Sequence, residues 1–430
     1  MAIEHLQAVP HLTTALSGPL HRLEEQLLAR QTEIEQWFRG QWLATLPPFY
    51  ASVDLRNAGF KLAPVDTNLF PAGFNNLNPA FQPLCIQAIQ TAVERFCPKA
   101  CRILVIPESH TRNVFYLESL ASLVHLLGLA GFQVDVGSLL PEITAPQTIT
   151  LPSGRALTLS PLTRDGNKLK VGDQTPCVVL LNNDLSGGVP EILKGLQDQP
   201  VVPPPGMGWM TRRKSRHFQL YRQVATEFAT IADIDPWLID PVFRQCGKID
   251  FQKREGEDCL TYYVEEVLNE IRAKYREYKI PDDPFVIVKA DAGTYGMNIM
   301  TVRSPEEVRD LNRKQRTKMA RGKEGFDVRE VLVQEGVYTF ETWEEAVAEP
   351  VVYMIDRFVV GGFYRVHAER GKDENLNAPG MTFKPLAFVE SCTCPDRRRA
   401  PDACPNRFYA YGVIARLALV AAAREIHTAA

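Results

Sequence analysis

A lysine followed by a glycine-containing loop is the first group of residues that could do chemistry. In the segment Val288-Lys-Ala-Asp-Ala-Gly-Thr-Tyr-Gly, an apolar run delivers Lys289, and Gly293 and Gly296 follow it. Glycines let a backbone approach phosphate oxygens closely, and a lysine ammonium adds a point charge. The chain has no G-x-x-x-x-G-K-[ST] sequence, so this is not the common phosphate-binding loop. A phosphate-binding loop and a plain β-hairpin with glycines in its turn both fit the segment.

Further polar residues later in the chain favour ATP chemistry. One apolar run ends in Gln334 and Glu335, which can hydrogen-bond the edge of a purine. A later pair of apolar runs ends in Arg365, which we expect on the same sheet, and Asn375 follows it. Lysine and arginine stabilise the negative charge that spreads over a phosphoryl group in transfer. Together with these residues, the lysine and its glycine loop are better explained as a phosphate-binding loop than as a plain β-hairpin.

A polar segment between residues 52 and 78 could bind amino acids. Arginine fits a carboxylate with two parallel hydrogen bonds, and Asp or Asn fits an ammonium group. A loop in which Asp and Asn only satisfy turn backbone is the alternative, but Arg and Lys are not turn formers. The candidate substrate contacts are Asp54, Arg56, Asn57, Lys61, Asp66, Asn68, Asn75 and Asn76.

A second candidate substrate segment follows the apolar run at residues 102–106. Ligands of parallel sheets bind at the carboxyl ends of the strands, where this segment begins. His110, Arg112 and Asn113 are therefore candidate contacts. Helix capping by Ser109 or Thr111 is the competing interpretation.

The elements that must position these residues begin with alternating strands and a helix. Short apolar runs at residues 102–106, 132–136 and 177–181 surround a segment of helical period at residues 114–129. This alternation predicts a parallel α/β sheet. A helix with one apolar face is predicted ahead of it, over residues 20–42.

A second set of elements follows a linker rich in proline and glycine at residues 200–208. An amphipathic helix over residues 260–278 precedes the strand that carries Lys289, and an Ala-rich helix covers about residues 409–426. We therefore expect two domains. Residues 1–200 would hold the N-terminal helix and an α/β amino-acid-binding domain, and residues 201–430 the catalytic domain.

The composition excludes several classes of protein. The chain has 430 residues, of which 45% are hydrophobic and 23% charged, so it can bury a large core. A formal net charge of -3 gives no reason to expect nucleic acid. The basic runs at residues 212–217 and 313–323 could bind phosphate, the second as a lid over the triphosphate, but we favour solvated faces for both. The absence of a bilayer-length apolar run or a signal-peptide pattern predicts a cytoplasmic protein with no membrane partner.

The nine cysteines are mostly scattered and indicate reduced thiols. Cys392, Cys394 and Cys404 cluster, but a zinc site normally needs a fourth Cys or His nearby. We favour a surface loop with free thiols over a metal clip or a redox switch.

The order of these motifs resembles the ATP-grasp superfamily over about residues 262–380. The segment Asn375-Leu-Asn-Ala-Pro-Gly is similar to the Gly-Asn-Leu-Ala-Ala-Gly-Gly loop of bacterial glutathione synthetases. The whole chain, including Pro64-Val-Asp-Thr-Asn-Leu-Phe-Pro-Ala-Gly, resembles the small bacterial glutamate–cysteine ligase family with this architecture. The resemblance implies an α/β fold, in which an N-terminal parallel α/β substrate domain precedes an ATP-grasp-like α+β nucleotide domain.

The resemblance also implies roles for single residues. Lys289 would bind the ATP phosphates, Gln334 and Glu335 would hold the adenine and the hinge, and Arg365 would face the transferred phosphoryl group with Asn375 beside it. The flexible loop over the phosphates would be Gly293, Thr294, Tyr295 and Gly296.

The magnesium ligands are where the chain departs from the superfamily. ATP-grasp enzymes usually end in an acidic residue on a strand followed by Glu-x-Asn, whereas here only His427-Thr-Ala-Ala follows the last helix. Our candidates for binding Mg²⁺ are Glu374 and Asn377, with Asp356 and Glu390 as alternatives.

The expected function is ATP-dependent ligation of L-glutamate to L-cysteine, the first step of glutathione biosynthesis. The γ-carboxylate would be activated as an acyl phosphate before the amine attacks. Another ATP-grasp carboxylate–amine ligase, such as a glutathione synthetase or a different γ-glutamyl ligase, is the alternative, and a non-catalytic nucleotide-binding protein is a second one. The expected partners are glutamate, cysteine and ATP with Mg²⁺, and a homo-oligomer is left open.

Overall fold

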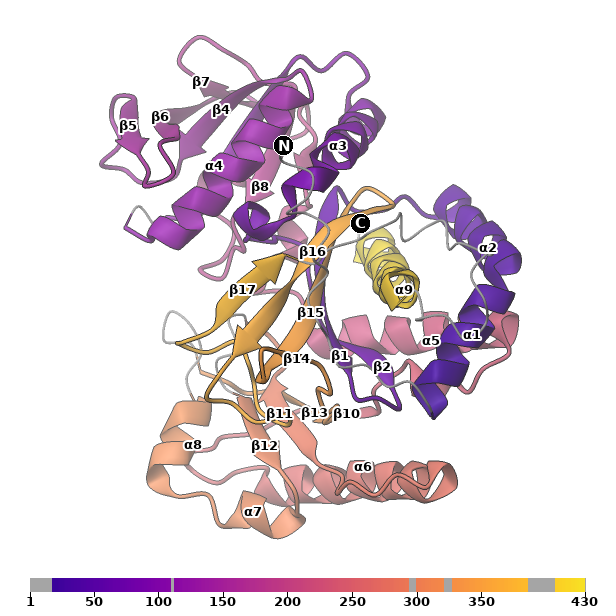
Figure 1. The fold of residues 1–430 in the computed structure, drawn as a ribbon. Coiled ribbons are helices and arrows are strands. Elements are labelled where there is room, and N and C mark those ends of the chain that lie inside the picture. Colours follow the sequence, from indigo (N-terminus) through magenta and orange to yellow (C-terminus); the bar gives the residue numbers. More distant parts are fainter. Residues whose placement is uncertain (1–17, 110–111, 294–298, 321–326, 386–406, 430) are drawn as a thin grey trace.

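Three β-sheets form the frame of the molecule in the computed structural model, which describes residues 18–109, 112–293, 299–320, 327–385 and 407–429 (Figure 1). The upper sheet in Figure 1 belongs to the N-terminal half, and its strand order is β5-β6-β4-β3-β8-β9, with β7 paired to β6. The strands are β3 (Arg102–Pro107), β4 (Gln133–Ser138), β5 (Gln147–Thr150), β6 (Ala156–Asp165), β7 (Lys168–Val171), β8 (Val178–Asn182) and β9 (Val201–Val202). The helices beside it are α3 (Gln82–Phe96) and α4 (Val114–Leu129).

The pairing in this first sheet confirms the predicted parallel α/β unit. Strand β3 pairs in parallel with both β4 and β8, and β4 pairs in parallel with β6. The apolar runs of the central strands β3 and β8 are buried almost throughout, as expected where both faces of a parallel sheet are covered.

The second sheet is antiparallel and occupies the middle of the molecule, in the order β17-β16-β15-β1-β2 with β14 beside β15. Its strands are β1 (Tyr50–Asn57), β2 (Leu62–Asn68), β14 (Thr342–Trp343), β15 (Ala346–Ile355), β16 (Phe358–His367) and β17 (Thr382–Pro385). The helices on its apolar side are α1 (Pro19–Ala29), α2 (Gln31–Ala44), α5 (Lys214–Ala232) and α9 (Arg407–Ala429).

The third sheet has four strands in the order β10-β13-β11-β12, and α6 packs on one of its faces. Its strands are β10 (Phe243–Cys246), β11 (Val286–Ala290), β12 (Ile299–Val302) and β13 (Val331–Glu335). The helices are α6 (Glu257–Tyr278), α7 (Pro305–Arg309) and α8 (Arg313–Ala320), and the 3-10 helices of the chain are η2 (Phe74–Asn76), η3 (Pro79–Phe81), η4 (Glu191–Leu193), η5 (Pro205–Met207) and η6 (Pro236–Leu238).

The expected fold class is confirmed, but the connections differ from the sequence analysis in three respects. Strands β1 and β2, expected in the first domain, pair with β15 of the second half. Arg365 lies in the second sheet and Gln334 in the third, so the expectation that they share a sheet was wrong. The single helix expected over residues 20–42 is two helices, α1 and α2, separated at Arg30.

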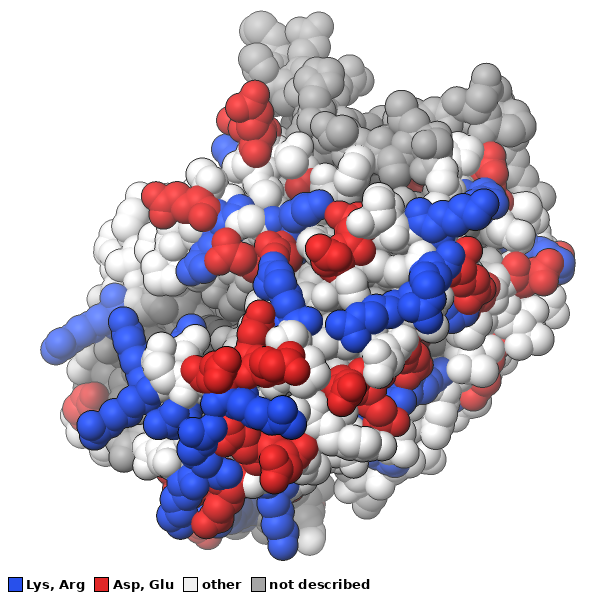
Figure 2. All heavy atoms as spheres, turned by 90° about the horizontal axis from the view of Figure 1, so that it is seen from below, with Lys and Arg blue, Asp and Glu red and all other residues white. Residues whose placement is uncertain are grey.

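One face of the molecule carries charges of both signs. Figure 2 shows the molecule from below, where basic and acidic side chains are interspersed. Opposite charges also pair across elements, as Arg244 of β10 does with Glu270 of α6 at 2.9 Å. A mixed surface of this kind has no large field of a single sign. None of the helices in the described part of the chain is long and apolar enough to cross a membrane.

Strands β15 and β16 approach so closely at Gly362 that we expect a substitution of this glycine to lower the stability of the protein. A Cβ at Gly362 would lie 2.3 Å from the Val351 carbonyl oxygen, so Gly362→Ala forces the two strands apart. We expect a loss of about 1–3 kcal/mol in the free energy of unfolding, measured by denaturant titration. Gly40→Ala in α2 is the control, because nothing lies within 4 Å of its Cβ position. The helix should gain up to about 1 kcal/mol there, and equal effects of the two changes would contradict the prediction.

Candidate active site

The second sheet has one polar face, which gathers charged residues from four strands. Asp54 of β1 lies opposite Asp66 of β2, and Glu349 of β15 lies opposite Arg365 of β16. Directly paired residues of an antiparallel ladder point to the same side. The opposite face of β1, with Val53 and Leu55, is apolar and belongs to the core. The predicted substrate segment is therefore a strand with one buried apolar face and one polar face.

Arg365 holds this polar face together through two carboxylates. Its Nη1 donates to Asp54 Oδ2 at 2.9 Å and to Glu349 Oε1 at 2.6 Å. Arg56 donates from Nε to the other oxygen of Glu349 at 2.9 Å. The Nε of Arg365 is buried and has no partner among the described residues, so this guanidinium can donate to a further ligand oxygen.

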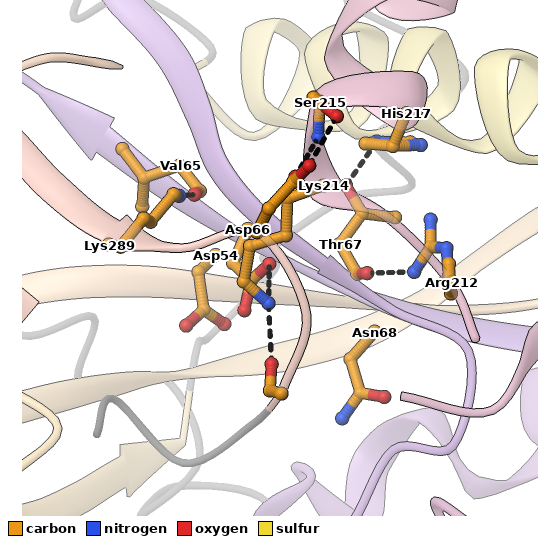
Figure 3. Close-up of polar contacts among 12 residues, drawn as sticks. Asp54, Val65, Asp66, Thr67, Asn68, Arg212, Lys214, Ser215, His217 and Lys289 are labelled. Atoms are coloured by element: carbon orange, nitrogen blue, oxygen red, sulfur yellow. Dashed lines mark hydrogen bonds and ion pairs between the residues drawn. The ribbon is translucent and has the colours of Figure 1, made fainter. Parts of the chain in front are cut away.

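The third sheet presents Lys289 on the face opposite α6. Because side chains alternate along a strand, Lys289 and Ile287 share this face, and Gln334 lies directly opposite Ile287. The Lys289 ammonium reaches across to the second sheet and donates to the Val65 carbonyl at 2.7 Å (Figure 3). The lysine face of the third sheet and the polar face of the second sheet therefore meet.

A second lysine, Lys214, enters the same space from the start of α5. Its Nζ donates to the Gly293 carbonyl at 2.7 Å and lies 3.8 Å from Asp66 Oδ1. The ammonium also sits over the ring of Trp209, 3.7 Å from its centroid. Figure 3 shows Lys214 and Lys289 with Asp54 and Asp66 between the two sheets. We call these four residues the lysine–aspartate centre.

The charges in the lysine–aspartate centre shift one another's pKa values. Removal from water, opposed by the Asp66 carboxylate and aided by the Lys214 ammonium, lowers the pKa of Lys289 to about 8. Removal from water also raises the pKa of Asp54, although the Arg365 guanidinium opposes this. For Asp66 the same desolvation is outweighed by Lys214 and Lys289, so the pKa of Asp66 falls below its usual value. Asp66 is thus a stable anion, and Asp54 is the better proton acceptor.

The two residues of the predicted hinge point in opposite directions. Gln334 is 2% exposed on the Lys289 face, and its Nε2 has no hydrogen-bond partner among the described residues. Glu335 lies on the α6 face, where its Oε2 accepts from Lys61 Nζ at 2.7 Å and from the Val242 amide at 2.9 Å. Gln334 can therefore take a ligand, whereas Glu335 and Lys61 form a buried ion pair away from the lysine–aspartate centre.

The other predicted substrate residues lie at several places. Asn57 is buried and its Nδ2 contacts Glu341, and Asn68 accepts from the Phe70 amide beside the centre. Asn75 and Asn76 form part of η2, Arg112 is exposed, and Asn113 caps α4 by accepting from the Tyr116 amide at 3.2 Å. The predicted site residues outside the described part of the chain are His110, Thr294, Tyr295, Gly296 and Glu390, together with Cys392, Cys394 and Cys404.

The predicted metal-binding loop lies next to the arginines. The Glu374 carbonyl accepts from Arg56, and its carboxylate accepts from Arg370 and from the Gly371 amide. Asn375 Oδ1 accepts from the Asn377 amide at 3.0 Å. The alternative ligand Asp356 pairs instead with Arg95, at 2.9 Å, in the turn between β15 and β16. Within the residues that the structure describes, no three His, Cys, Asp or Glu side chains are grouped to hold a metal.

The basic run at residues 212–217 was wrongly interpreted as a solvated face. Arg212, Lys214 and His217 are all buried. The signal that could have revealed them is the apolar stripe of α5. Residues four positions apart lie on the same face of a helix, so Tyr221 shares its face with His217, and Phe218 shares its face with Lys214.

A cleft of about 480 Å³ opens beside Lys214. Trp209, Met210 and Ala290 form apolar walls, and Gly293 lies at its edge. Arg213 and Glu330, which pair at 2.9 Å, supply charged groups on the wall. The cleft adjoins the lysine–aspartate centre through Trp209 and Gly293, which both contact Lys214, although none of the four residues of the centre lines it.

The family model for glutamate–cysteine ligase matches residues 24–426 of this chain. The chain belongs to the glutamate–cysteine ligase family. The family and the ligase activity that we expected from the motifs are therefore confirmed.

Solved structures extend the comparison. The chain is 61% identical to a candidate gamma-glutamylcysteine synthetase from Methylobacillus flagellatus, with a TM-score of 0.91 over 98% of this chain and 99% of that one. A glutathione synthetase-like effector from Globodera pallida is 10% identical, with a TM-score of 0.36 over 85% of this chain and 80% of that one. D-alanyl-alanine synthetase A from Vibrio cholerae is 11% identical, with a TM-score of 0.28 over 60% of this chain and 68% of that one. A comparison with curated proteins gave no match.

The lowered pKa of Lys289 predicts the pH dependence of the ligase. The ammonium is lost as pH rises through its pKa of about 8, so kcat/KM for ATP should fall above that pH in the free enzyme. Lys289→Arg keeps its charge because the arginine pKa exceeds about 12, and its lower activity should stay level up to about pH 9.5. The measurement is kcat/KM for ATP between about pH 6.5 and 9.5. An alkaline decline that persists in Lys289→Arg would exclude Lys289 as its source.

Proposed function

We propose that the enzyme joins the γ-carboxylate of L-glutamate to the amino group of L-cysteine, with ATP cleaved to ADP and phosphate. The product, γ-glutamylcysteine, is the first intermediate of glutathione synthesis. The supporting observation is the lysine–aspartate centre, which brings two cations and two carboxylates between the sheets of a chain from this ligase family. Such a site can neutralise phosphates and hold an amino acid at the same time.

ATP would lie between the second and third sheets. Lys289 and Lys214 would hold its phosphates, because both ammonium groups already bind carbonyl oxygens in this space. Gln334 would donate its unpartnered Nε2 hydrogen to a ring nitrogen of the adenine. Burying that amide without a partner costs roughly 1–3 kcal/mol, which a purine acceptor would recover.

The chemistry has two steps. A γ-carboxylate oxygen of glutamate attacks the terminal phosphorus of ATP, ADP leaves, and an acyl phosphate forms. The cysteine amine then attacks the acyl carbon, phosphate leaves, and the amine gives up a proton. Asp54, with its raised pKa, is our candidate for accepting that proton, and Asp66 for holding the glutamate ammonium.

Arg365 would stabilise the phosphoryl group during transfer. Its buried Nε lacks a partner among the described residues, while Nη1 is anchored by Asp54 and Glu349. A fixed guanidinium needs little reorganisation when charge develops in front of it. Arg56, anchored on the same Glu349, would support this geometry.

The acidic residues fit Mg²⁺ only together with phosphate oxygens. Protein sites for Mg²⁺ often provide one or two carboxylates and leave the remaining positions to substrate phosphates and water. Asp54 and Asp66 lie beside the lysines, but both already have roles in the proposed chemistry, so Glu374 and Asn377 remain our candidate Mg²⁺ ligands. Bound Mg²⁺ would neutralise phosphate charge. Glu374 could take part only if its carboxylate left Arg370.

An assay of ADP release tests the proposal. ADP should appear with glutamate plus cysteine, in equal amounts to γ-glutamylcysteine, and not with either amino acid alone. ADP release with γ-glutamylcysteine plus glycine instead would indicate a glutathione synthetase activity. The absence of release in every combination would contradict catalysis by this chain.

Arg365→Lys tests the transfer step. Lysine keeps one charge but loses the planar group that can hold several oxygens, so we expect turnover to fall roughly a hundredfold while ATP affinity changes little. The measurements are kcat, ATP affinity by calorimetry, and the thermal midpoint. Arg95→Lys is the matched control, because Arg95 also pairs with a buried acid, Asp356, but far along β15. If Arg365→Lys lowers only the midpoint, as the control should, Arg365 has no part in transfer.

A further inference from the structure

Glu425 in α9 is a buried acid that the proposed chemistry does not use. Its carboxylate accepts from Arg212 Nε at 3.1 Å and from Arg212 Nη2 at 2.9 Å. The same carboxylate lies 3.2 Å from His217 Nδ1. Glu425 is 5% exposed, and the Arg212 guanidinium helps to hold its pKa at about 2 against the opposing effect of burial. The carboxylate is therefore ionised at any physiological pH.

Both partners of Glu425 continue to the same residue of β2. Arg212 Nη1 donates to the Thr67 carbonyl at 2.6 Å, and His217 Nε2 lies 2.9 Å from Thr67 Oγ1 (Figure 3). Burial lowers the pKa of His217, which favours the neutral ring. A neutral ring that donates from Nδ1 to a carboxylate must accept at Nε2, so the Thr67 hydroxyl donates to it. Each hydrogen bond in this chain of contacts then has a defined donor and acceptor.

The chain of contacts holds the two segments that carry Asp66 and Lys214 of the lysine–aspartate centre. Asp66 immediately precedes Thr67 in β2, and Lys214 lies between Arg212 and His217 at the start of α5. Fixing Thr67 by its carbonyl and its hydroxyl fixes the strand position of Asp66. Fixing Arg212 and His217 fixes the first turn of α5, from which Lys214 extends.

We propose that Glu425 is a positioning residue for the ligase reaction, which sets Lys214 against Asp66 through Arg212, His217 and Thr67. The inference rests on the proposed role of Lys214 in binding ATP phosphates. Small displacements of such groups are costly, because catalysis depends on reacting atoms being held within a fraction of an ångström. The carboxylate also offsets the charge of Arg212, which would otherwise add to that of the two lysines.

The chain offers a matched control beside Glu425. Arg424, the preceding residue of α9, pairs with Glu227 of α5 at 2.8 and 2.6 Å. This pair joins the same two helices, but it is partly exposed and contacts neither β2 nor Lys214. Glu227→Gln therefore loosens the helix packing without touching the centre.

The experiment compares Glu425→Gln, Glu425→Asp and Glu227→Gln in the full-length enzyme. We measure kcat and KM for ATP with saturating glutamate and cysteine, ATP affinity by calorimetry, and the thermal midpoint. Loss of a charged hydrogen-bonded partner corresponds to a change of about ten- to hundredfold, so kcat/KM for ATP should fall by that factor in Glu425→Gln. Glu425→Asp, which keeps the charge, should recover part of the loss, and Glu227→Gln should stay within about twofold of the wild type.

A second variant covers the case in which Glu425→Gln does not fold. Thr67→Val keeps the shape of the side chain and removes only the hydroxyl, so it should raise KM for ATP in the same direction by about three- to tenfold. The inference is overturned if Glu425→Gln, or Thr67→Val in its place, lowers the thermal midpoint while kcat and ATP affinity stay at wild-type values. A wild-type enzyme that releases no ADP would count against the proposed function alone, because ATP affinity by calorimetry still tests the role of Glu425.

Discussion

The contact between the lysine face of the third sheet and the polar face of the second sheet is the constraint on which the site depends. Lys289 reaches the Val65 carbonyl across this contact, and Lys214 closes it from α5. Ammonium and carboxylate groups removed from water are tolerated only when each has a partner close by. The arrangement of Asp54, Asp66 and Arg365 follows from this requirement, since each lies within reach of an opposite charge.

The sequence predicted the local elements well, because their signals are local. The strand before Lys289, the antiparallel return after its loop and the apolar stripe of α6 all appear as expected. Periodicity also indicated which side chains of one strand share a face. It did not indicate which faces meet, because that depends on residues far apart in the chain. Asp54 and Arg365, for example, are separated by 311 positions, and neither has a local signal for the other.

The predicted roles of two lysines show the same limit. Lys61 and Lys289 have similar surroundings in sequence, with apolar neighbours and a nearby glycine. Lys61 is fully buried in an ion pair with Glu335, whereas Lys289 faces the space between the sheets. Lys61 lies in the turn just before β2, whereas Lys289 lies within β11, and the partner that each ammonium meets is set only when the sheets pack together. Lys214 was missed because the basic run was interpreted without the apolar stripe of α5 that continues it.

The pairing of β1 with β15 also bears on how the enzyme is made. The hairpin of β1 and β2 emerges early during synthesis, but its partner strands begin at Ala346. At about 5–20 residues per second, the 311 positions between Asp54 and Arg365 correspond to roughly 15–60 s of waiting. During that time the polar face of the hairpin can remain in water without cost, while its apolar face lacks α9, the last helix, which packs on both β1 and β2. The reactive centre is thus completed only after most of the chain has left the ribosome.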